Sequence, residues 1–323
     1  MSDLKTVSQL PSDQFKIDGL EIPNRLALAP MDGYTDSPFR RIAKRFGAGL
    51  LYSEFINGMD VVINHPALKE KLSFTPEERP FGIQLFDDDP ERLLKASQIV
   101  AQRYQPDFID INFGCPNRRV VSRGAGAALL AYPERLGRMV NDLYTHSDIP
   151  ITAKIRLGPD ADTRNHLDVT RIIEENGAQC IAVHGRTTDQ GLKGKADWDA
   201  IAEVCQTISI PVIGNGDVSH PHHITEKSRQ ANCEGIMIGR GAIGNPWIFS
   251  YQDKRQISKE EVIQVMAAHL ELSMSFYGRE RGLIIFRKHA NEYIDSLNPS
   301  KQMRKELLTC RDPETFLAVA QRN

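Results

Sequence analysis

The 323-residue sequence is poor in cysteine and tryptophan. Its five cysteines are odd in number and widely spaced, and no two of them form a C-x-x-C pair. This pattern argues against a disulfide framework and against a zinc site, and it indicates a reducing compartment. We therefore expect a protein without a bound metal.

Long apolar runs and a strong net charge are also missing. No segment approaches the roughly 20 apolar residues of a membrane helix, and the polar residues 1–19 lack the apolar stretch of a signal peptide. The formal net charge of −2 does not indicate a general polyanion binder. We expect a cytoplasmic, monomeric enzyme that makes no membrane contact.

One region departs from this average charge. Residues 279–305 contain seven Lys/Arg and three Asp/Glu, which gives a net charge of +4. A solvated helical surface and an RNA-facing surface both explain such a bias. The charge count alone leaves both explanations open.

Short apolar runs alternate with stretches of helical spacing, such as residues 90–104, 132–147 and 166–177. Eight strands that alternate with helices predict an α/β fold, and the chain length favours a closed (β/α)8 TIM barrel over an open doubly wound sheet. A Rossmann-type sheet would need G-x-G-x-x-G after its first strand, where this sequence has APMDGYTDSPF. The predicted strands are 24–31, 49–55, 81–86, 108–114, 151–158, 180–185, 211–217 and 235–241.

The alternation stops after residue 249, and the remaining chain has helical patterns. Residues 258–278 open with Ser258 and Glu261 three positions apart, which is typical of a capping box. Further helices are predicted over 282–297 and 313–323. The sequence therefore predicts a barrel domain over residues 1–252 and a small C-terminal all-helical domain over 253–323.

Residues at the predicted strand ends indicate an anion site. In TIM barrels the active site collects at the C-terminal ends of the strands, and the loops after the last two strands often hold a phosphate. Here those strands end in NGD (215–217) and GRG (239–241), where glycines let backbone N–H groups approach an anion and Arg240 adds charge. Each tripeptide alone is also explained by a tight turn, but together they favour a phosphate site.

Other strand ends indicate a flat, partly anionic ring. Lys154 on the fifth strand needs an anionic partner if it points inward, and His184 lies at the end of the next strand. Gln84 can donate to and accept from a ring amide edge, and the backbone of residues 30–32 can line the ring. A phosphate, a lysine and a glutamine without a metal-ligand cluster fit flavin mononucleotide (FMN), whose reduced anionic form the lysine would stabilise.

Six stretches, in the same order, resemble the tRNA-dihydrouridine synthases over about residues 18–250, and the helical tail resembles the family's RNA-binding domain more loosely. The resemblance implies that NADPH reduces FMN, which then reduces the C5=C6 bond of specific uridines in tRNA. It assigns FMN contacts to Pro30, Met31, Asp32, Gln84, Lys154, Asn215, Gly216, Asp217, Gly239 and Arg240. The stretches are LAPMDGYTDSPFR, DINFGCPNRRVVSRGAGAALL, AKIRLG, VHGRTTDQG, PVIGNGDV and MIGRGAIGNPWIF.

The family's proton donor matches Cys115 in GCPNRR. A thiol with an ordinary pKa of about 8.5 is protonated at neutral pH, so it can protonate uracil C5 while a flavin delivers hydride to C6. A nucleophilic cysteine would instead need to be a thiolate with a base beside it. The other four cysteines are expected to be packing residues, namely Cys180, Cys205, Cys233 and Cys310.

Several residues are candidates for contacts with RNA. Arg118 and Arg119 follow the thiol and are expected to hold phosphates near a uridine flipped out of its stack, although two solvated loop arginines would have the same sequence. The further candidates for substrate or tRNA contact are Asn112, Arg186, Arg287, Lys288 and Arg304.

Three other functions share part of this pattern. A dihydroorotate dehydrogenase-like enzyme would use the same flavin on a free pyrimidine, but it has no need for a basic helical tail. A phosphosugar isomerase or aldolase would use the phosphate site and Lys154 as a base or Schiff-base residue. An RNA-binding or folding factor could keep the barrel without catalysis. The target uridine, and whether another RNA is a substrate, do not follow from any short motif.

Overall fold

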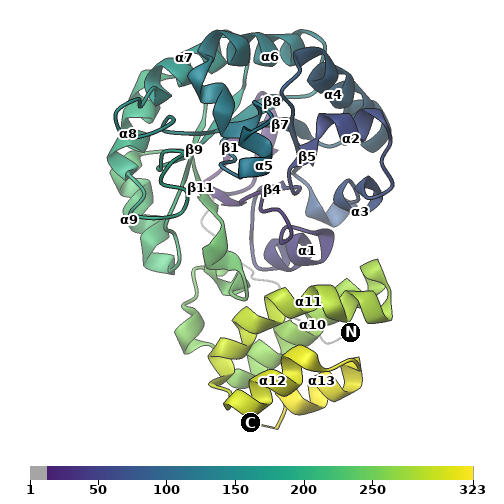
Figure 1. Cartoon of the computed structure of the whole chain (residues 1–323). Coiled ribbons are helices and arrows are strands. Elements are labelled where there is room, and N and C mark those ends of the chain that lie inside the picture. Colours follow the sequence, from purple (N-terminus) through teal and green to yellow (C-terminus); the bar gives the residue numbers. More distant parts are fainter. Residues whose placement is uncertain (1–12, 323) are drawn as a thin grey trace.

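The computed structural model describes residues 13–322, and within this range eight parallel strands form a barrel surrounded by helices (Figure 1). Neighbouring strands follow the order β3-β11-β10-β9-β8-β7-β6-β4, and the bridge between Ala27 and Leu50 closes the ring. The predicted TIM barrel is confirmed. Its strands are β3 (Leu26–Leu28), β4 (Leu51–Tyr52), β6 (Phe81–Phe86), β7 (Phe108–Phe113), β8 (Ile151–Arg156), β9 (Cys180–His184), β10 (Val212–Asn215) and β11 (Gly235–Ile238); a short β5 (Ile56–Asn57) also pairs with β6.

Each strand alternates between the barrel interior and the helix layer, because side chains point to opposite faces with a period of two. On β7, Phe108 belongs to the inner apolar cluster at the N-terminal end, whereas Asp110 and Asn112 follow it toward the C-terminal end. On β9, Cys180 and Ala182 belong to the same inner cluster, and His184 follows them at the C-terminal end of the strand. The interior is therefore apolar at the bottom of the barrel and polar at its mouth.

A two-stranded hairpin, β1 (Phe15–Ile17) and β2 (Leu20–Ile22), precedes the barrel and was not predicted. Ile17 and Ile22 are fully buried in the inner cluster of the barrel, which places the hairpin at its apolar bottom. The turn is Asp18-Gly19, and both residues have positive φ values of 46° and 83°. This dipeptide is a strong hairpin signal.

The barrel helices form the outer layer and are amphipathic. α4 coincides with the predicted helix over 90–104; it begins at Pro90 after the capping residue Asp89 and buries Leu93, Ala96 and Val100. The predicted helices over 132–147 and 166–177 are slightly shorter in the structure. The outer helices are α1 (Ser37–Arg45), α2 (Gly58–Val62), α3 (Leu68–Lys71), α4 (Pro90–Tyr104), α6 (Pro133–Thr145), α7 (His166–Glu175), α8 (Trp198–Thr207) and α9 (Pro221–Ala231).

The C-terminal part consists of α10 (Lys259–Tyr277), α11 (Arg279–Ile294), α12 (Lys301–Thr309) and α13 (Pro313–Ala320), which pack together beside α1 (Figure 1). The predicted boundary after residue 252 falls between the short turns η4 (Pro246–Ser250) and η5 (Lys254–Gln256). None of the helices within residues 13–322 has the length and apolar composition needed to span a bilayer.

Only one of the two hydrogen bonds of the capping box predicted for α10 forms. The hydroxyl of Ser258 accepts from the Glu261 N–H at 3.2 Å, as a capping residue does. The Glu261 carboxylate instead accepts from the indole N–H of Trp247 at 2.6 Å. Because buried Trp247 lies in η4, this contact joins the helical domain to the end of the barrel domain.

Candidate functional site

A cavity of about 580 Å³ opens at the C-terminal ends of the strands. This volume falls within the range of about 300–1,000 Å³ that is usual for cofactor sites. The structure brings together at its wall every residue predicted to bind the cofactor, together with Cys115, Asn112 and Arg186. The cofactor candidates there are Pro30, Met31, Asp32, Gln84, Lys154, His184, Asn215, Gly216, Asp217, Gly239 and Arg240.

A buried chain of hydrogen bonds leads from the barrel interior to the cysteine. Gln84 Nε2 donates to Asp110 Oδ2 at 2.6 Å, and Gln84 Oε1 accepts from Asn112 Nδ2 at 2.8 Å. Asn112 Oδ1 then accepts from the backbone N–H of Cys115 at 2.8 Å. Thr152 Oγ1 completes the chain by donating to Asp110 Oδ1 at 2.5 Å. The network orients Asn112 and the turn that carries Cys115.

These bonds change the expected role of Gln84. Its side chain is fully buried, and both ends of its amide already have protein partners. Gln84 lines the cavity, but its amide oxygen is already engaged in holding the Asn112 side chain in place. Asp110, which the sequence analysis did not select, anchors the network. The signal for it was a carboxylate inside the mainly apolar FIDINF strand.

The Cys115 side chain lies half-buried at the cavity wall, directly before the short helix α5 (Arg118–Val121). Burial raises the pKa of this thiol, against smaller lowering effects from the Asn117 N–H and from Arg156. The group is therefore a thiol at neutral pH. It can give a proton, whereas a nucleophilic role would require the thiolate.

Two cations come from alternate positions of β8. Lys154 Nζ donates to Asn215 Oδ1 at 3.1 Å, and Arg156 donates through Nε to the Gly114 carbonyl and through Nη1 to those of Thr187 and Gly191, all at 2.8 Å. Across residues 13–322 neither side chain forms an ion pair with a carboxylate. Burial, followed by repulsion from Arg156, lowers the pKa of Lys154 to about 8.

His184 and Arg186 lie at the end of β9 and in the following loop. Burial and the neighbouring cations, first Lys154 and then Arg156, lower the pKa of His184 to about 2, so the imidazole is neutral. Arg186 Nη1 lies 3.3 Å from His184 Nε2. Because a guanidinium only donates, Nε2 must accept and the proton sits on Nδ1.

Arg186 is 2% exposed and was predicted to contact substrate. Its Nη2 donates to both carboxylate oxygens of Asp217, at 2.7 and 2.8 Å, and its other bonds reach the carbonyls of Lys193 and Gly194. The side chain therefore holds the β9 and β10 loops together. Because Arg186 engages the Asp217 carboxylate, Asp217 presents mainly its backbone to the cavity.

The loops after β10 and β11 approach each other closely. A Cβ on Gly241 would lie 2.2 Å from the Val218 carbonyl oxygen, so only glycine fits there. Gly216 has a φ of 137°, which other residues rarely adopt. Arg240, exposed, opens the 3-10 turn η3 (Arg240–Ala242), whose first N–H groups have no intrahelical acceptor. This arrangement can bind a phosphate.

The five predicted RNA contacts that do not line the cavity fall into two groups. Arg118 and Arg119 are exposed on α5 beside the cavity, and in the described chain neither has a carboxylate partner. The other three are half-buried and already engaged: Arg287 donates to the Cys310 carbonyl, Lys288 to the Gly33 carbonyl, and Arg304 to Asn291 and Asp295.

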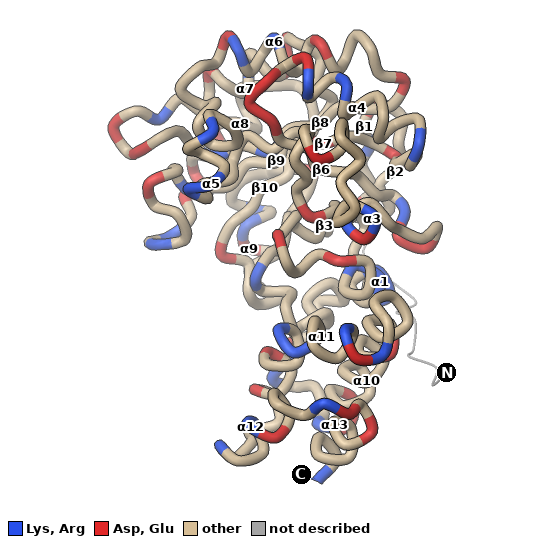
Figure 2. Tube along the Cα trace, turned by 45° about the vertical axis from the view of Figure 1, so that its right-hand side comes forward, with Lys and Arg blue, Asp and Glu red and all other residues tan. Residues whose placement is uncertain are grey.

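Basic and acidic residues are interspersed over the helical domain (Figure 2). Arg279 pairs with Asp312 and Glu314, and Arg281 pairs with Glu70 of the barrel domain. Lys301 and Lys305, by contrast, are exposed and have no carboxylate partner among residues 13–322. They are stronger candidates for phosphate contacts than Arg287, Lys288 or Arg304.

The chain is similar in sequence and in fold to known proteins. A sequence model of the dihydrouridine synthase family matches residues 27–323. The chain is 36% identical over 311 residues to tRNA-dihydrouridine synthase B of Pasteurella multocida, covering 94% of this chain and 93% of that protein. It is 35% identical to a probable tRNA-dihydrouridine synthase of Rhodobacter capsulatus, with 94% and 95% coverage. Histamine dehydrogenase from Rhizobium sp. 4-9 shares the fold, with a TM-score of 0.58 and 13% identity, over 81% of this chain and 50% of that one.

Proposed function

Because this chain belongs to the dihydrouridine synthase family, we propose that it reduces specific uridines of tRNA to 5,6-dihydrouridine on an FMN held in the barrel cavity, with NADPH as the electron donor. The single observation that carries the proposal is the convergence of Cys115, Lys154 and the β10–β11 loops on one cavity of suitable volume. The family match favours this function over a free-pyrimidine dehydrogenase, an aldolase and a non-catalytic RNA-binding factor.

The cavity fits an anionic flavin. Lys154, Arg156 and Arg240 line it without forming ion pairs to carboxylates of the described chain. Burying the charges of Lys154 and Arg156 without a carboxylate partner is costly, so an anionic ligand would offset the cost. Gly216, Gly239, Arg240 and Gly241 would hold the phosphate, and Lys154 would face the ring.

In the proposed reaction, a bound FMN that NADPH has reduced would supply a hydride for uracil C6. Cys115 holds a proton on Sγ and delivers it to C5, and its raised pKa keeps the thiol protonated until the substrate arrives. Asn112 fixes the backbone of Cys115 through its 2.8 Å bond and has its side chain at the cavity wall, where it can contact the base. Neutral His184 can donate through Nδ1–H without adding charge.

Entry of the base requires a flipped uridine, because the cavity lies at the strand ends rather than on an open surface. Arg118 and Arg119 are proposed to hold the phosphates that flank this nucleotide. Lys301 and Lys305 are proposed to contribute a second, sequence-independent contact with the tRNA backbone. We also propose that the protein is a monomer and acts in the cytoplasm.

The experiment that tests this function is nucleoside mass spectrometry of tRNA incubated with purified protein and NADPH, mapped by position. A gain of dihydrouridine at a defined position supports the proposal and identifies the target uridine. A yellow protein that oxidises NADPH without changing tRNA would point to another RNA or to a free pyrimidine. A colourless protein that does not take up added FMN would contradict the flavin assignment.

A further inference from the structure

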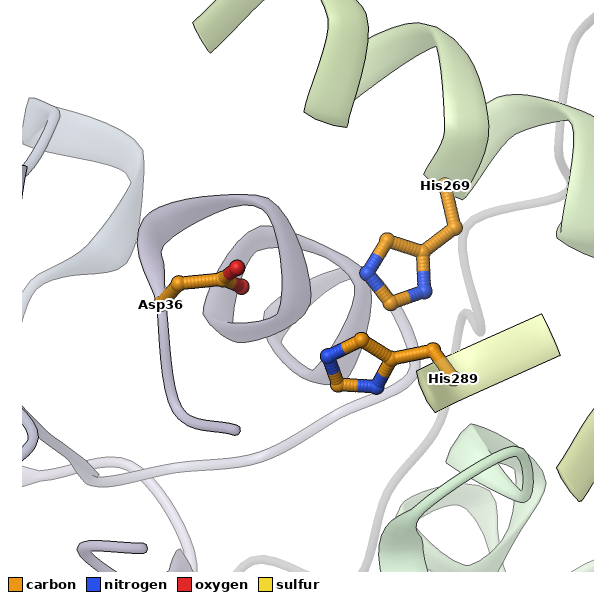
Figure 3. A group of neighbouring side chains, drawn as sticks. All are labelled: Asp36, His269 and His289. Atoms are coloured by element: carbon orange, nitrogen blue, oxygen red, sulfur yellow. The ribbon is translucent and has the colours of Figure 1, made fainter. Parts of the chain in front are cut away.

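A buried group of one aspartate and two histidines lies between the barrel and the helical domain (Figure 3). Asp36 caps α1 by accepting from the Phe39 N–H at 3.1 Å. His269 comes from α10 and His289 from α11. The three residues are only 5%, 1% and 1% exposed. One carboxylate oxygen and one nitrogen from each ring all lie within 4.8 Å of one another.

His289 has no hydrogen-bond partner for either ring nitrogen among the described residues, although both nitrogens are buried. Buried polar groups in native proteins are nearly always hydrogen-bonded, so an imidazole with two unsatisfied nitrogens requires an explanation. Figure 3 shows that both imidazoles turn the nitrogen farther from the backbone toward the Asp36 carboxylate. The unpartnered group therefore points into the cluster.

An ion pair between a protonated histidine and Asp36 does not account for this arrangement. Within the described chain, neither imidazole forms a hydrogen bond or an ion pair with Asp36. Burial, with a smaller effect from Lys288, lowers the pKa of His269 to about 3, and burial together with His269 and Lys288 holds the pKa of His289 well below its ordinary value. Both rings are neutral, which is the form that binds metal ions.

We infer that Asp36, His269 and His289 form a binding site for a divalent transition-metal ion, with Zn²⁺ as the best match to two imidazoles and one carboxylate. This assignment departs from the expectation of a metal-free protein, which rested on the lack of closely spaced ligands. The three residues come from distant parts of the sequence, so no spacing motif could reveal them.

The surrounding hydrogen bonds suit this role. Tyr293 Oη lies 3.3 Å from His269 Nδ1 and can accept its proton, which leaves the lone pair of Nε2 for the ion. Tyr277 Oη donates to Asp36 Oδ2 at 3.1 Å. Tetrahedral zinc bonds of about 2.0–2.2 Å place ligand atoms roughly 3.5 Å apart, so ligand atoms that lie up to 4.8 Å apart must approach one another by about 1 Å. Three protein ligands leave a fourth position for solvent.

The ion would connect the two domains. Asp36 follows the residues 30–32 that line the cavity, whereas both histidines belong to the helical domain. Metal binding would therefore fix the helical domain relative to the cavity mouth. Lys288 lies over the Tyr34 ring and donates to the Gly33 carbonyl, so its charge is held on the barrel side of the cluster.

Any test must distinguish this site from a second group of histidines. His220, His222 and His223 lie near the start of α9, with ring centroids 4.3–5.6 Å apart, and they are exposed or half-buried. Such a surface group can retain metal during purification. Its variant, with His222→Ala and His223→Ala, removes two imidazoles from the surface group and serves as the control.

The test uses full-length, tag-free holoprotein stripped with a chelator, then incubated with Zn²⁺ and desalted. Zinc per chain is measured by plasma mass spectrometry and the ligands by X-ray absorption at the zinc edge. We expect one ion per chain with two imidazoles and oxygen ligands, and a higher melting temperature. His289→Ala should weaken binding roughly 100-fold or more and remove the melting shift, while the His222/His223 control keeps both.

Asp36→Asn provides a second variant, because asparagine can keep the helix cap while losing the charge. It should also lose zinc if the assignment is correct. The inference is overturned if the stripped protein takes up no zinc, or if His289→Ala and Asp36→Asn retain it. Loss of zinc only in the His222/His223 variant would equally overturn it, by locating the ion on the surface.

Discussion

The cavity and the helical domain both carry many cations, but they differ in what neutralises them. In the cavity, the bonds of Lys154 and Arg156 to other described residues reach only amide and carbonyl oxygens. In the helical domain, Arg279, Arg281 and Arg304 all pair with carboxylates. Within the cavity, the cations that the described chain leaves without carboxylates are therefore available to an anionic ligand, whereas the paired arginines of the helical domain serve the fold.

The same comparison limits what a charge count can say about RNA binding. Residues 253–323 contain 12 Lys/Arg and 10 Asp/Glu, so the domain is only weakly basic as a whole. The segment that looks most basic in sequence, residues 279–305, is neutralised in part by Asp312, Glu314 and Glu70, which lie outside it.

Cys115→Ala removes the proposed proton from the cavity while leaving its cations in place. Dihydrouridine formation should fall roughly 100- to 1,000-fold, as expected for loss of a general acid, while the protein stays yellow and still oxidises NADPH. Single-turnover reduction of tRNA measures the first quantity and absorbance the second. Cys205→Ala, at another half-buried cysteine outside the cavity, is the control. Full activity in the Cys115 variant would exclude the thiol from the mechanism.

Asp110→Asn changes a buried carboxyl beneath the cavity. Burial raises the pKa of Asp110 to about 6, above the value of about 3.9 in an unfolded chain. The folded protein then binds more protons at this site between those values, so the contribution of Asp110 to the free energy of unfolding is highest below about pH 4 and declines by roughly 2–3 kcal/mol as the pH rises to 6.

The Asp110→Asn variant should lose this decline, which urea unfolding at several pH values will measure. Asp148→Asn, at an exposed site, should keep it. An identical pH dependence in the wild-type protein and the Asp110 variant would mean that Asp110 titrates like an ordinary surface carboxyl.

Lys154→Met tests whether a cation without a carboxylate partner serves the cofactor. We expect FMN affinity to fall about tenfold or more, because a charge-assisted contact to an anionic ring is lost. Lys44→Met is a matched control, since burial also lowers the pKa of Lys44 to about 8, but this lysine lies on α1 away from the cavity. Flavin content after gel filtration and fluorescence titration provide the measurements. Equal losses in both variants would indicate a general effect on stability.

Lys301→Glu combined with Lys305→Glu tests the exposed cations of α12, which lie one helical turn apart. The affinity for tRNA should fall several-fold at low salt, and the slope of log K against log salt should decrease by about 1 to 2. Arg279→Glu with Arg281→Glu changes the same number of charges at paired sites and should alter the salt slope less. The opposite ranking would show that ion pairing within the chain does not decide which cations meet RNA.

Periodicity was a sound guide to the barrel because its strands are short, apolar and separated by amphipathic helices. It failed where the elements are small or polar. The residues of α12 bury only Met303 and Leu307, so their helical pattern is weak. The β1–β2 hairpin has strands of three residues each, and the Asp18-Gly19 turn was the usable signal.

For the site, the strand-end residues were predictable because a barrel brings all strand ends to one mouth. The partners of those residues were not. Nothing in the sequence indicates that Asp217 engages Arg186 or that Gln84 bonds to Asp110, because such contacts depend on register between neighbouring strands. The same limit applies to Asp36, His269 and His289, which meet only after the two domains pack.

The three carbonyl contacts of Arg156 have a mechanical consequence. One rigid guanidinium ties the loop after β7, which carries Cys115, to the loop after β9. The loop that carries Cys115 and the loop after β9 are therefore expected to move together. Cys115, the proposed proton donor, would then keep its position relative to the β9 side of the cavity when a nucleotide enters.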